Sequence, residues 1–215
     1  MPVNALRALL GVLCMSACGG TTTPPPGEGP GYPTHISTPS SLPGNWALDQ
    51  EVTITHEEGE NSFRAVLQKQ GDQLTMVGLG PHGGRAFMLT QTGTEFAWET
   101  FLPIELPFPP EYMLHDVHRT LLQPNQPPVD GSTELRFERY DERITESWRD
   151  SKLYERTYER LDGSPSGTLV ARYPDGLDPS APAETSPPTI VTFENNWHGY
   201  RVTIRTLSYT PITAP

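Results

Sequence analysis

The residues that come closest to a metal-ligand pattern are His115, Asp116 and His118, in the segment after a proline-rich stretch. Imidazole and carboxylate groups are common zinc ligands. These three residues cannot all point to one metal ion from the same helix face. The sequence also indicates no further ligand elsewhere in the chain. A solvated edge of an amphipathic helix is the simpler interpretation. We therefore expect no metal and no cofactor.

Two other groups invite a catalytic interpretation. Residues 163–167 place serines between glycines, but the G-x-S-x-G elbow of serine hydrolases is absent, because Pro165 occupies its centre. Glu155 and Glu159 could form the carboxylate pair of a glycosidase, although on one strand face they are expected to be solvated charges. The sequence therefore predicts a protein that is not an enzyme.

Cys18 has the clearest chemical assignment. A short apolar segment begins after Arg7, and Ser16 and Ala17 directly precede the cysteine. This is the pattern of a bacterial lipobox, in which the signal peptide is removed and the cysteine is acylated. An ordinary secretory signal is the alternative. A membrane span is disfavoured, because the apolar run is far shorter than the roughly 20 residues it needs. We predict a signal peptide over residues 1–17 and lipidation of Cys18.

Residues around the cysteine and the overall charge indicate a location. Gly19 follows Cys18, and no acidic residue occurs before Glu28, which favours sorting to the outer membrane of a diderm bacterium, on its periplasmic face. The chain has 15 Lys and Arg against 26 Asp and Glu, a net charge of -11, which disfavours nucleic acid as a partner. Membrane contact is therefore expected through acyl chains.

The composition divides the chain into regions. Residues 18–44 are rich in proline, glycine and threonine and are predicted to be a disordered linker after the lipidated cysteine. Residues 45–210 have globular composition and are expected to form one domain, and residues 211–215 are a tail.

Hydrophobic residues in the domain mostly alternate, which predicts strands. Segments such as residues 50–56, 63–68 and 74–77 are short and separated by turn residues, as at Gly71 and Asp72. About ten or eleven strands in sequence favour an antiparallel meander over alternating strands and helices. Residues 110–122 are the exception, because Met113, Leu114, Val117 and Leu121 recur at helical spacing. A sheet of this size tends to curl, and with one helix it would enclose a cavity.

Some side chains leave two interpretations open. Tyr154, Arg156, Tyr158 and Arg160 could grip an anionic head group, or could form a ladder on the outer surface of the sheet, which is the commoner arrangement. The four tryptophans could line a lipid cavity or fill a core. Residues predicted to line the cavity or to form its gate are Phe96, Trp98, Met88, Met113, Val117, Leu121, Leu106 and Phe108.

The order of four stretches resembles an uncharacterised family of bacterial outer-membrane lipoproteins similar to LolB, the outer-membrane lipoprotein receptor of the LolA/LolB-like superfamily. These stretches are the lipobox at Cys18, residues 74–89, residues 109–117, and residues 140–148 with the closing strand 200–207. The resemblance covers about residues 45–210. It implies a mainly β fold, an unclosed and strongly curved antiparallel β-barrel with a helical lid.

The same resemblance implies a function. Members of such a family are expected to bind or pass on acyl chains in an apolar interior. The cargo would be a lipoprotein, a lipid or an aryl-polyene-type lipid, and the partner a periplasmic LolA-like carrier. The loop at Pro81, His82 and Gly83 corresponds to the LolB loop that carries an exposed leucine, and His82 stands where that leucine would be. This departure argues against the insertion step but leaves the cavity intact. A filled barrel that docks an export or synthesis complex is the alternative.

Overall fold

The structure is a computed structural model that describes residue 32 and residues 36–103, 106, 108–123, 127–128, 132–178 and 187–213. The predicted signal peptide, Cys18 and the last two residues of the predicted tail lie outside the described residues. Within the described part, no helix is long and apolar enough to cross a membrane.

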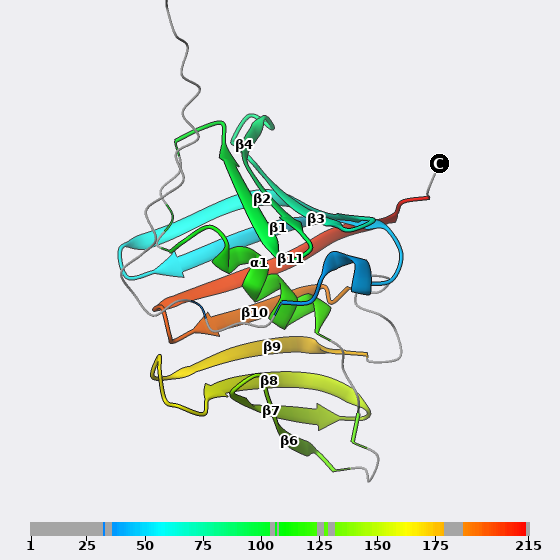
Figure 1. The fold of residues 1–215 in the computed structure, drawn as a ribbon, viewed down its shortest axis with the longest axis vertical. Coiled ribbons are helices and arrows are strands. Elements are labelled where there is room, and N and C mark those ends of the chain that lie inside the picture. Colours follow the sequence, from blue (N-terminus) through cyan, green and yellow to red (C-terminus); the bar gives the residue numbers. More distant parts are fainter. Residues whose placement is uncertain are drawn as a thin grey trace, which may run out of the picture.

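The domain is built on a single sheet of eleven antiparallel strands, in agreement with the predicted meander (Figure 1). The strands are β1 (Trp46–His56), β2 (Gly59–Gln70), β3 (Gln73–Leu79), β4 (Arg85–Thr92), β5 (Glu95–Thr100), β6 (Glu134–Arg139), β7 (Glu142–Arg149), β8 (Lys152–Arg160), β9 (Thr168–Leu177), β10 (Ile190–Asn195) and β11 (Tyr200–Pro211).

The order of strands across the sheet is β5-β4-β3-β2-β1-β11-β10-β9-β8-β7-β6. Every pair of neighbours is also adjacent in the sequence except β1 and β11, which pair along their length from Trp46 opposite Pro211 to His56 opposite Tyr200. β5 and β6 are the two edges of this sheet. The sheet is therefore an unclosed barrel, as predicted.

Alternating burial explains why these segments form strands that curl around a core. In β1 the inward positions are Trp46, Leu48, Gln50, Val52 and Ile54, and the residues that alternate with them are more exposed. The expected turn between β2 and β3 is present, and Gly71 adopts a φ of 58° that suits glycine. The apolar face of the sheet forms the concave side.

One helical segment crosses that concave face (Figure 1). It consists of the α-helix α1 (Tyr112–Val117) and a continuing π-helix, η2 (His118–Leu122), which together match the predicted helix over residues 110–122. His118 Nε2 is 2.7 Å from Gln91 Oε1 on β4, and the neighbouring Arg119 carbonyl accepts a hydrogen bond from Tyr158 on β8 at 3.0 Å. Six strands separate β4 from β8 in the sheet order, so the sheet curves far enough for both to reach the helix.

The outer face of the helix is also covered. Tyr32 and residues 36–44 are here called the N-terminal strap, which includes the 3-10 helix η1 (Pro39–Ser41). Tyr32 packs against the helix, and Ile36 and Ser37 lie beside it. The Tyr32 ring stacks on His115 at 4.9 Å, and Gln91 Nε2 donates to the Ser37 carbonyl at 3.0 Å. The expected solvated edge of the helix is therefore wrong, because His115, Asp116 and His118 are all buried. The folded unit includes the described residues of the predicted linker.

Candidate functional site

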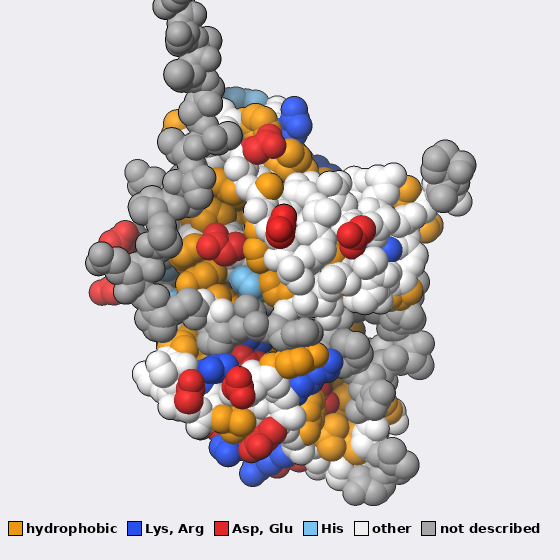
Figure 2. All heavy atoms as spheres, in the orientation of Figure 1, with side chains coloured by type: hydrophobic (Ala, Val, Ile, Leu, Met, Phe, Trp, Pro, Cys, Tyr) orange, Lys and Arg blue, Asp and Glu red, His pale blue; other side chains and the backbone are white. Residues whose placement is uncertain are grey.

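A wide, mainly apolar groove with a volume of about 860 Å³ lies at one end of the sheet. We call it the rim groove. The rim groove lies between the start of β2, the β3–β4 loop and the chain that follows β5. Figure 2 shows hydrophobic side chains, in orange, in the upper part of the view. Its lining residues are Asn61, Ser62, Phe63, Arg64, Leu79, Gly80, Pro81, Gly83, Ala86, Phe87, Leu102, Pro103 and Leu106.

A row of three aromatic rings runs from this groove across the sheet. Phe63 contacts Phe87 edge to face with centroids 5.4 Å apart, and Phe87 stacks with Trp98 at 4.9 Å. Gly78 on β3 makes room for this row, because a Cβ atom there would collide with the Phe87 ring. The wall of the groove is therefore fixed by ring packing within β2, β3, β4 and β5.

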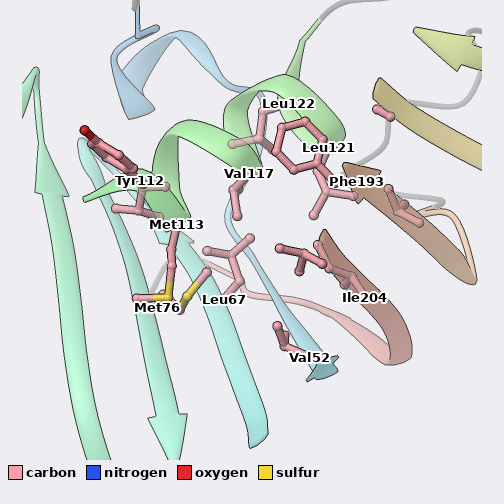
Figure 3. Close-up of a cluster of buried hydrophobic side chains, with 14 of the residues drawn as sticks. Val52, Leu67, Met76, Tyr112, Met113, Val117, Leu121, Leu122, Phe193 and Ile204 are labelled. Carbon is pink, nitrogen blue, oxygen red and sulfur yellow. The ribbon is translucent and has the colours of Figure 1, made fainter. Parts of the chain in front are cut away.

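A second hollow is enclosed between the helix and the sheet. It measures about 30 Å³, room for little more than a water molecule. Val52, Met76, Met113, Val117 and Ile204 are among its walls. Figure 3 shows Met113 reaching from the helix toward Met76 on β3, with Leu67 beside them. Side chains thus fill most of the space between this side of the helix and the sheet.

Asp116 anchors the polar side of the helix. It accepts hydrogen bonds from the Tyr32 hydroxyl and, at 2.7 Å, from the Tyr200 hydroxyl. Asn195 Nδ2 in turn donates to the Tyr200 hydroxyl at 2.8 Å. Burial raises the pKa of Asp116 to about 7, although both tyrosine hydrogen bonds and the positive charge of Arg119 act to lower it. This cluster ties together the strap, the helix and the β10–β11 hairpin.

The two helix histidines are held neutral. Burial lowers the pKa of His115 to about 3, and Arg119 and His118 act in the same direction. Burial and the Arg119 charge lower the pKa of His118 to about 4. Because Gln91 Nε2 donates to the carbonyls of Ser37 and Gly93, its Oε1 is left to accept from His118 Nε2. Among the described residues, no group of three or more His, Cys, Asp or Glu is placed to hold a metal ion.

Two buried ion pairs support the C-terminal half of the helix. Arg119 donates to both carboxylate oxygens of Glu142 on β7, at 2.8 and 3.1 Å. Arg156 Nε donates to Glu146 Oε1 at 2.7 Å, and both side chains are fully buried, at 1% and 2% exposure. Trp148 Nε1 donates to the other Glu146 oxygen at 3.1 Å. Each buried arginine is therefore neutralised by a glutamate, so neither pair leaves an uncompensated charge inside the barrel.

Two tyrosines, on β8 and β9, donate hydrogen bonds to backbone carbonyls near the C-terminal end of the helix. The hydroxyls of Tyr158 and Tyr173 donate to the carbonyls of Arg119 and Thr120, at 3.0 and 2.8 Å. Carbonyls at a helix end have no partner within the helix, so these bonds complete it. The outer-surface ladder that was the commoner expectation for Tyr154 and its neighbours is therefore wrong at its centre, because Arg156 and Tyr158 face inward.

The predicted cavity and gate residues divide between the two hollows. Leu106, Pro81 and Gly83 line the rim groove, and exposed His82 lies in the same loop without lining it. Phe108, Met113 and Val117 line the enclosed cavity. The remaining four candidates line neither hollow: Trp98, Phe96, Leu121 and Met88.

Those four residues still have identifiable positions. Trp98 belongs to the aromatic row, Phe96 contacts the His115 ring edge on at 5.2 Å, and Leu121 is buried in the core. Met88 lies between the inward-facing Phe87 and Leu89, so strand alternation directs it to the opposite face of the sheet.

Sequence reasoning missed Phe63 and Phe87, although a signal for one of them exists. Phe63 shares the inward register of Ala65 and Leu67 on β2, which alternation along residues 63–68 already implied. Phe87 stands in an uninterrupted apolar run, where alternation cannot choose a face.

The groups considered for catalysis have structural partners. Glu155 accepts from Arg172 Nε at 2.9 Å, and exposed Glu159 accepts from Arg143 at 3.2 Å. Ser164 and Ser166 are exposed residues of the β8–β9 connection.

The four tryptophans differ in burial. Trp46, Trp148 and Trp197 are core residues, whereas Trp98 is half-buried beside the groove.

Residues 47–208 match the family described as "Protein of unknown function (DUF3261)". The chain belongs to this family. The prediction of an uncharacterised family is thereby confirmed, and the observed sheet is the unclosed, curved antiparallel architecture that the resemblance to LolB implied. No curated protein matches the sequence.

Fold comparison finds solved structures that are similar to this member of the family. One is a LolA superfamily protein from Nitrosomonas europaea, with a TM-score of 0.42 and 12% identity over 84% of this chain and 90% of the other. A second is a putative outer membrane lipoprotein-sorting protein domain from Vibrio parahaemolyticus, with a TM-score of 0.41 and 8% identity over 80% and 87% of the two chains. A third is a DUF1329 family protein from Desulfovibrio piger, with a TM-score of 0.36 and 12% identity over 78% and 85%.

Proposed function

We propose that this protein is a lipoprotein anchored through Cys18 at the periplasmic face of the outer membrane, and that its domain binds a hydrophobic cargo without catalysing a reaction. The rim groove is the observation that carries the proposal. It is large enough for a ligand, since ligand sites usually span about 300–1,000 Å³, and it is walled mainly by apolar side chains.

The cargo is the acyl chain of a lipoprotein or lipid, or an aryl-polyene-type chain. Phe63, Phe87 and Leu102 supply the apolar walls that such a chain requires. A periplasmic carrier related to LolA would deliver or receive it. Acyl anchoring at Cys18 would hold the groove near the membrane, where such cargo is available.

Binding can be tested on residues 18–215 expressed without the predicted signal peptide and carrying Cys18→Ser, so that the complete mature chain is made without an acyl anchor. We expect native mass spectrometry to detect one bound lipid, and a fluorescent fatty acid to bind and be displaced by unlabelled fatty acid. Leu102→Asp places a charge in the groove and should weaken binding at least tenfold, because a charge disfavours an apolar ligand there. Leu102 and Leu207 are 44% and 45% exposed, so Leu207→Asp is a matched control outside the groove. Equal binding by the two variants contradicts this location.

The small enclosed cavity favours one other function. A space of only about 30 Å³ between the helix and the sheet suits a filled barrel that acts as an interaction module for an export or synthesis complex. This function predicts that no fatty acid binds the mature chain. It also predicts that cross-linking to the complex depends on the proline-rich segment at residues 174–188 and is unaffected by Leu102→Asp.

A further inference from the structure

The two apolar hollows share a single side chain. Phe63 is the one residue that lines both the rim groove and the enclosed cavity in the described part of the chain. Its ring is half-buried and makes a T-shaped contact with the Phe87 ring on one side. Moving this ring would therefore join the two spaces.

The cavity beyond Phe63 is suited to the apolar end of a flexible chain. Its walls include Met76 on β3, Met113 on α1 and Phe108 in the connection before α1. Methionine side chains adjust readily to the shape of an occupant.

Its polar lining residues have partners within the fold. Asp116 accepts from two tyrosines, and Thr120 Oγ1 donates to the Asp116 carbonyl at 2.7 Å. Gln50 Nε2 is 3.5 Å from Thr206 Oγ1. The remaining lining is apolar and favours an alkyl chain over a polar head.

The polar part of the rim groove lies at its outer side. Its polar side chains are Asn61, Ser62 and Arg64, all near the start of β2. Arg64 is paired with Asp49 and is 56% exposed, which places its charge at the solvent side of the groove. The two ends of the path therefore differ in polarity, with water and polar groups outside and thioether and alkyl groups inside.

We propose that the Phe63 ring is the partition between the rim groove and a methionine-lined tail pocket, and that its displacement admits the distal end of one linear acyl or polyene chain, threaded tail first. This inference rests on the proposed function, because it assigns an orientation and a depth to cargo that binds in the groove. Phe63 thereby determines the chain length that the site accepts.

The test compares octanoate, dodecanoate and hexadecanoate as competitors of a fluorescent fatty acid, on the complete mature chain carrying Cys18→Ser. Phe63→Ala removes the partition and should raise the preference for hexadecanoate over octanoate by about tenfold, the effect of burying one or two further methylene groups. Phe63→Trp should lower that preference. Phe63→Leu serves if the alanine variant does not fold. Phe96→Ala is the matched control, since Phe96 is also half-buried and lines neither hollow.

A second measurement does not depend on the cargo. Xenon dissolved under pressure should shift the NMR signals of the Met76 and Met113 methyl groups more in Phe63→Ala than in the parent chain or in Phe96→Ala. Unchanged chain-length preference in every Phe63 variant, together with binding by the parent chain, overturns the partition while the proposed function stands. Failure of all fatty acids to bind overturns the proposed function and the tail pocket, and the xenon shifts then show separately whether Phe63 divides the interior.

Discussion

Tyr32 and Asp116 are 84 positions apart in the sequence, yet the tyrosine hydroxyl donates a buried hydrogen bond to the aspartate carboxylate. The N-terminal strap is thereby fixed to the helix inside the barrel. Because the partners are buried, this bond should contribute measurably to stability.

Tyr32→Phe should lower the free energy of unfolding by about 1–3 kcal/mol, because a buried oxygen of Asp116 loses one of its donors. Urea denaturation measures the change, and Tyr209→Phe, a half-buried tyrosine on β11, is the control. A double-mutant cycle with Asp116→Asn should give a coupling energy of about 1 kcal/mol or more. Additive effects of the two substitutions would contradict the bond.

Acid should destabilise the fold through the helix histidines. Their pKa values are lowered from 6.5 to about 3 and about 4, so between about pH 4 and 6.5 the unfolded chain binds protons that the folded chain does not. Stability therefore rises with pH in this window. Asp116 acts oppositely, because its raised pKa makes the folded chain bind the extra proton between about pH 4 and 7.

The contribution of one histidine can be isolated with His118→Gln. Each group that differs fully in protonation changes stability by about 1.4 kcal/mol per pH unit. Urea denaturation at pH 5 and 6 should show a smaller loss on acidification for His118→Gln than for the parent chain, by up to this amount. An identical slope would show that His118 is not buried neutral. Exposed His82→Gln is the control.

Removing one partner of the buried Arg156–Glu146 pair should destabilise the fold more than removing both charges. Arg156→Met leaves the Glu146 carboxylate buried without its cation, which should cost about 3–5 kcal/mol. Adding Glu146→Gln removes the charge and keeps an oxygen for Trp148, so the double variant should recover much of the loss. Thermal and urea unfolding test this, and a double variant less stable than Arg156→Met would rule it out.

Gly78→Ala should disturb the aromatic row. The new methyl group would collide with the Phe87 ring, which is only 2% exposed, and such overpacking costs about 1–3 kcal/mol. Phe87→Leu in the same chain should relieve part of this cost. Gly84→Ala has open space around its Cβ position and should change stability by less than about 0.5 kcal/mol. Equal effects at both glycines would contradict the packing.

Cys18 lipidation predicts a simple biochemical outcome. The parent protein should incorporate labelled palmitate and fractionate with the outer membrane, whereas Cys18→Ser should lose the label and remain as an uncleaved precursor. Cys14→Ser should leave labelling unchanged, because that residue belongs to the predicted signal peptide. Labelling that persists in Cys18→Ser would refute the assignment.

Local sequence pattern was sufficient for most of the fold. Alternating residues and turn glycines such as Gly71 predicted the strands, and the spacing of Met113, Val117 and Leu121 predicted the helix face that meets the sheet. The other face could not be predicted. Its burial depends on Tyr32, a single aromatic residue in a proline-rich and glycine-rich segment that carries no periodic signal.

The candidate site was predictable only where one face of a strand was clearly apolar. The sequence predicts Met88 as a cavity residue within an uninterrupted apolar run, whereas strand register places Phe87 inward instead. Arg156 and Tyr158 alternate with residues that are also polar, so period two identified a shared face without showing which face is the core. Both outcomes depend on which face of the strand the register of the folded sheet turns toward the core.

The pairing of β1 with β11 has a consequence for how the chain reaches its native state. All other strand pairs in the described sheet form between sequence neighbours and can close as local hairpins, whereas this one joins segments about 150 residues apart. During synthesis, one side of β1 stays without its partner until the final strand has emerged. Until β11 pairs with it, this edge of β1 exposes unpaired backbone N–H and C=O groups, which can pair with another chain and cause aggregation.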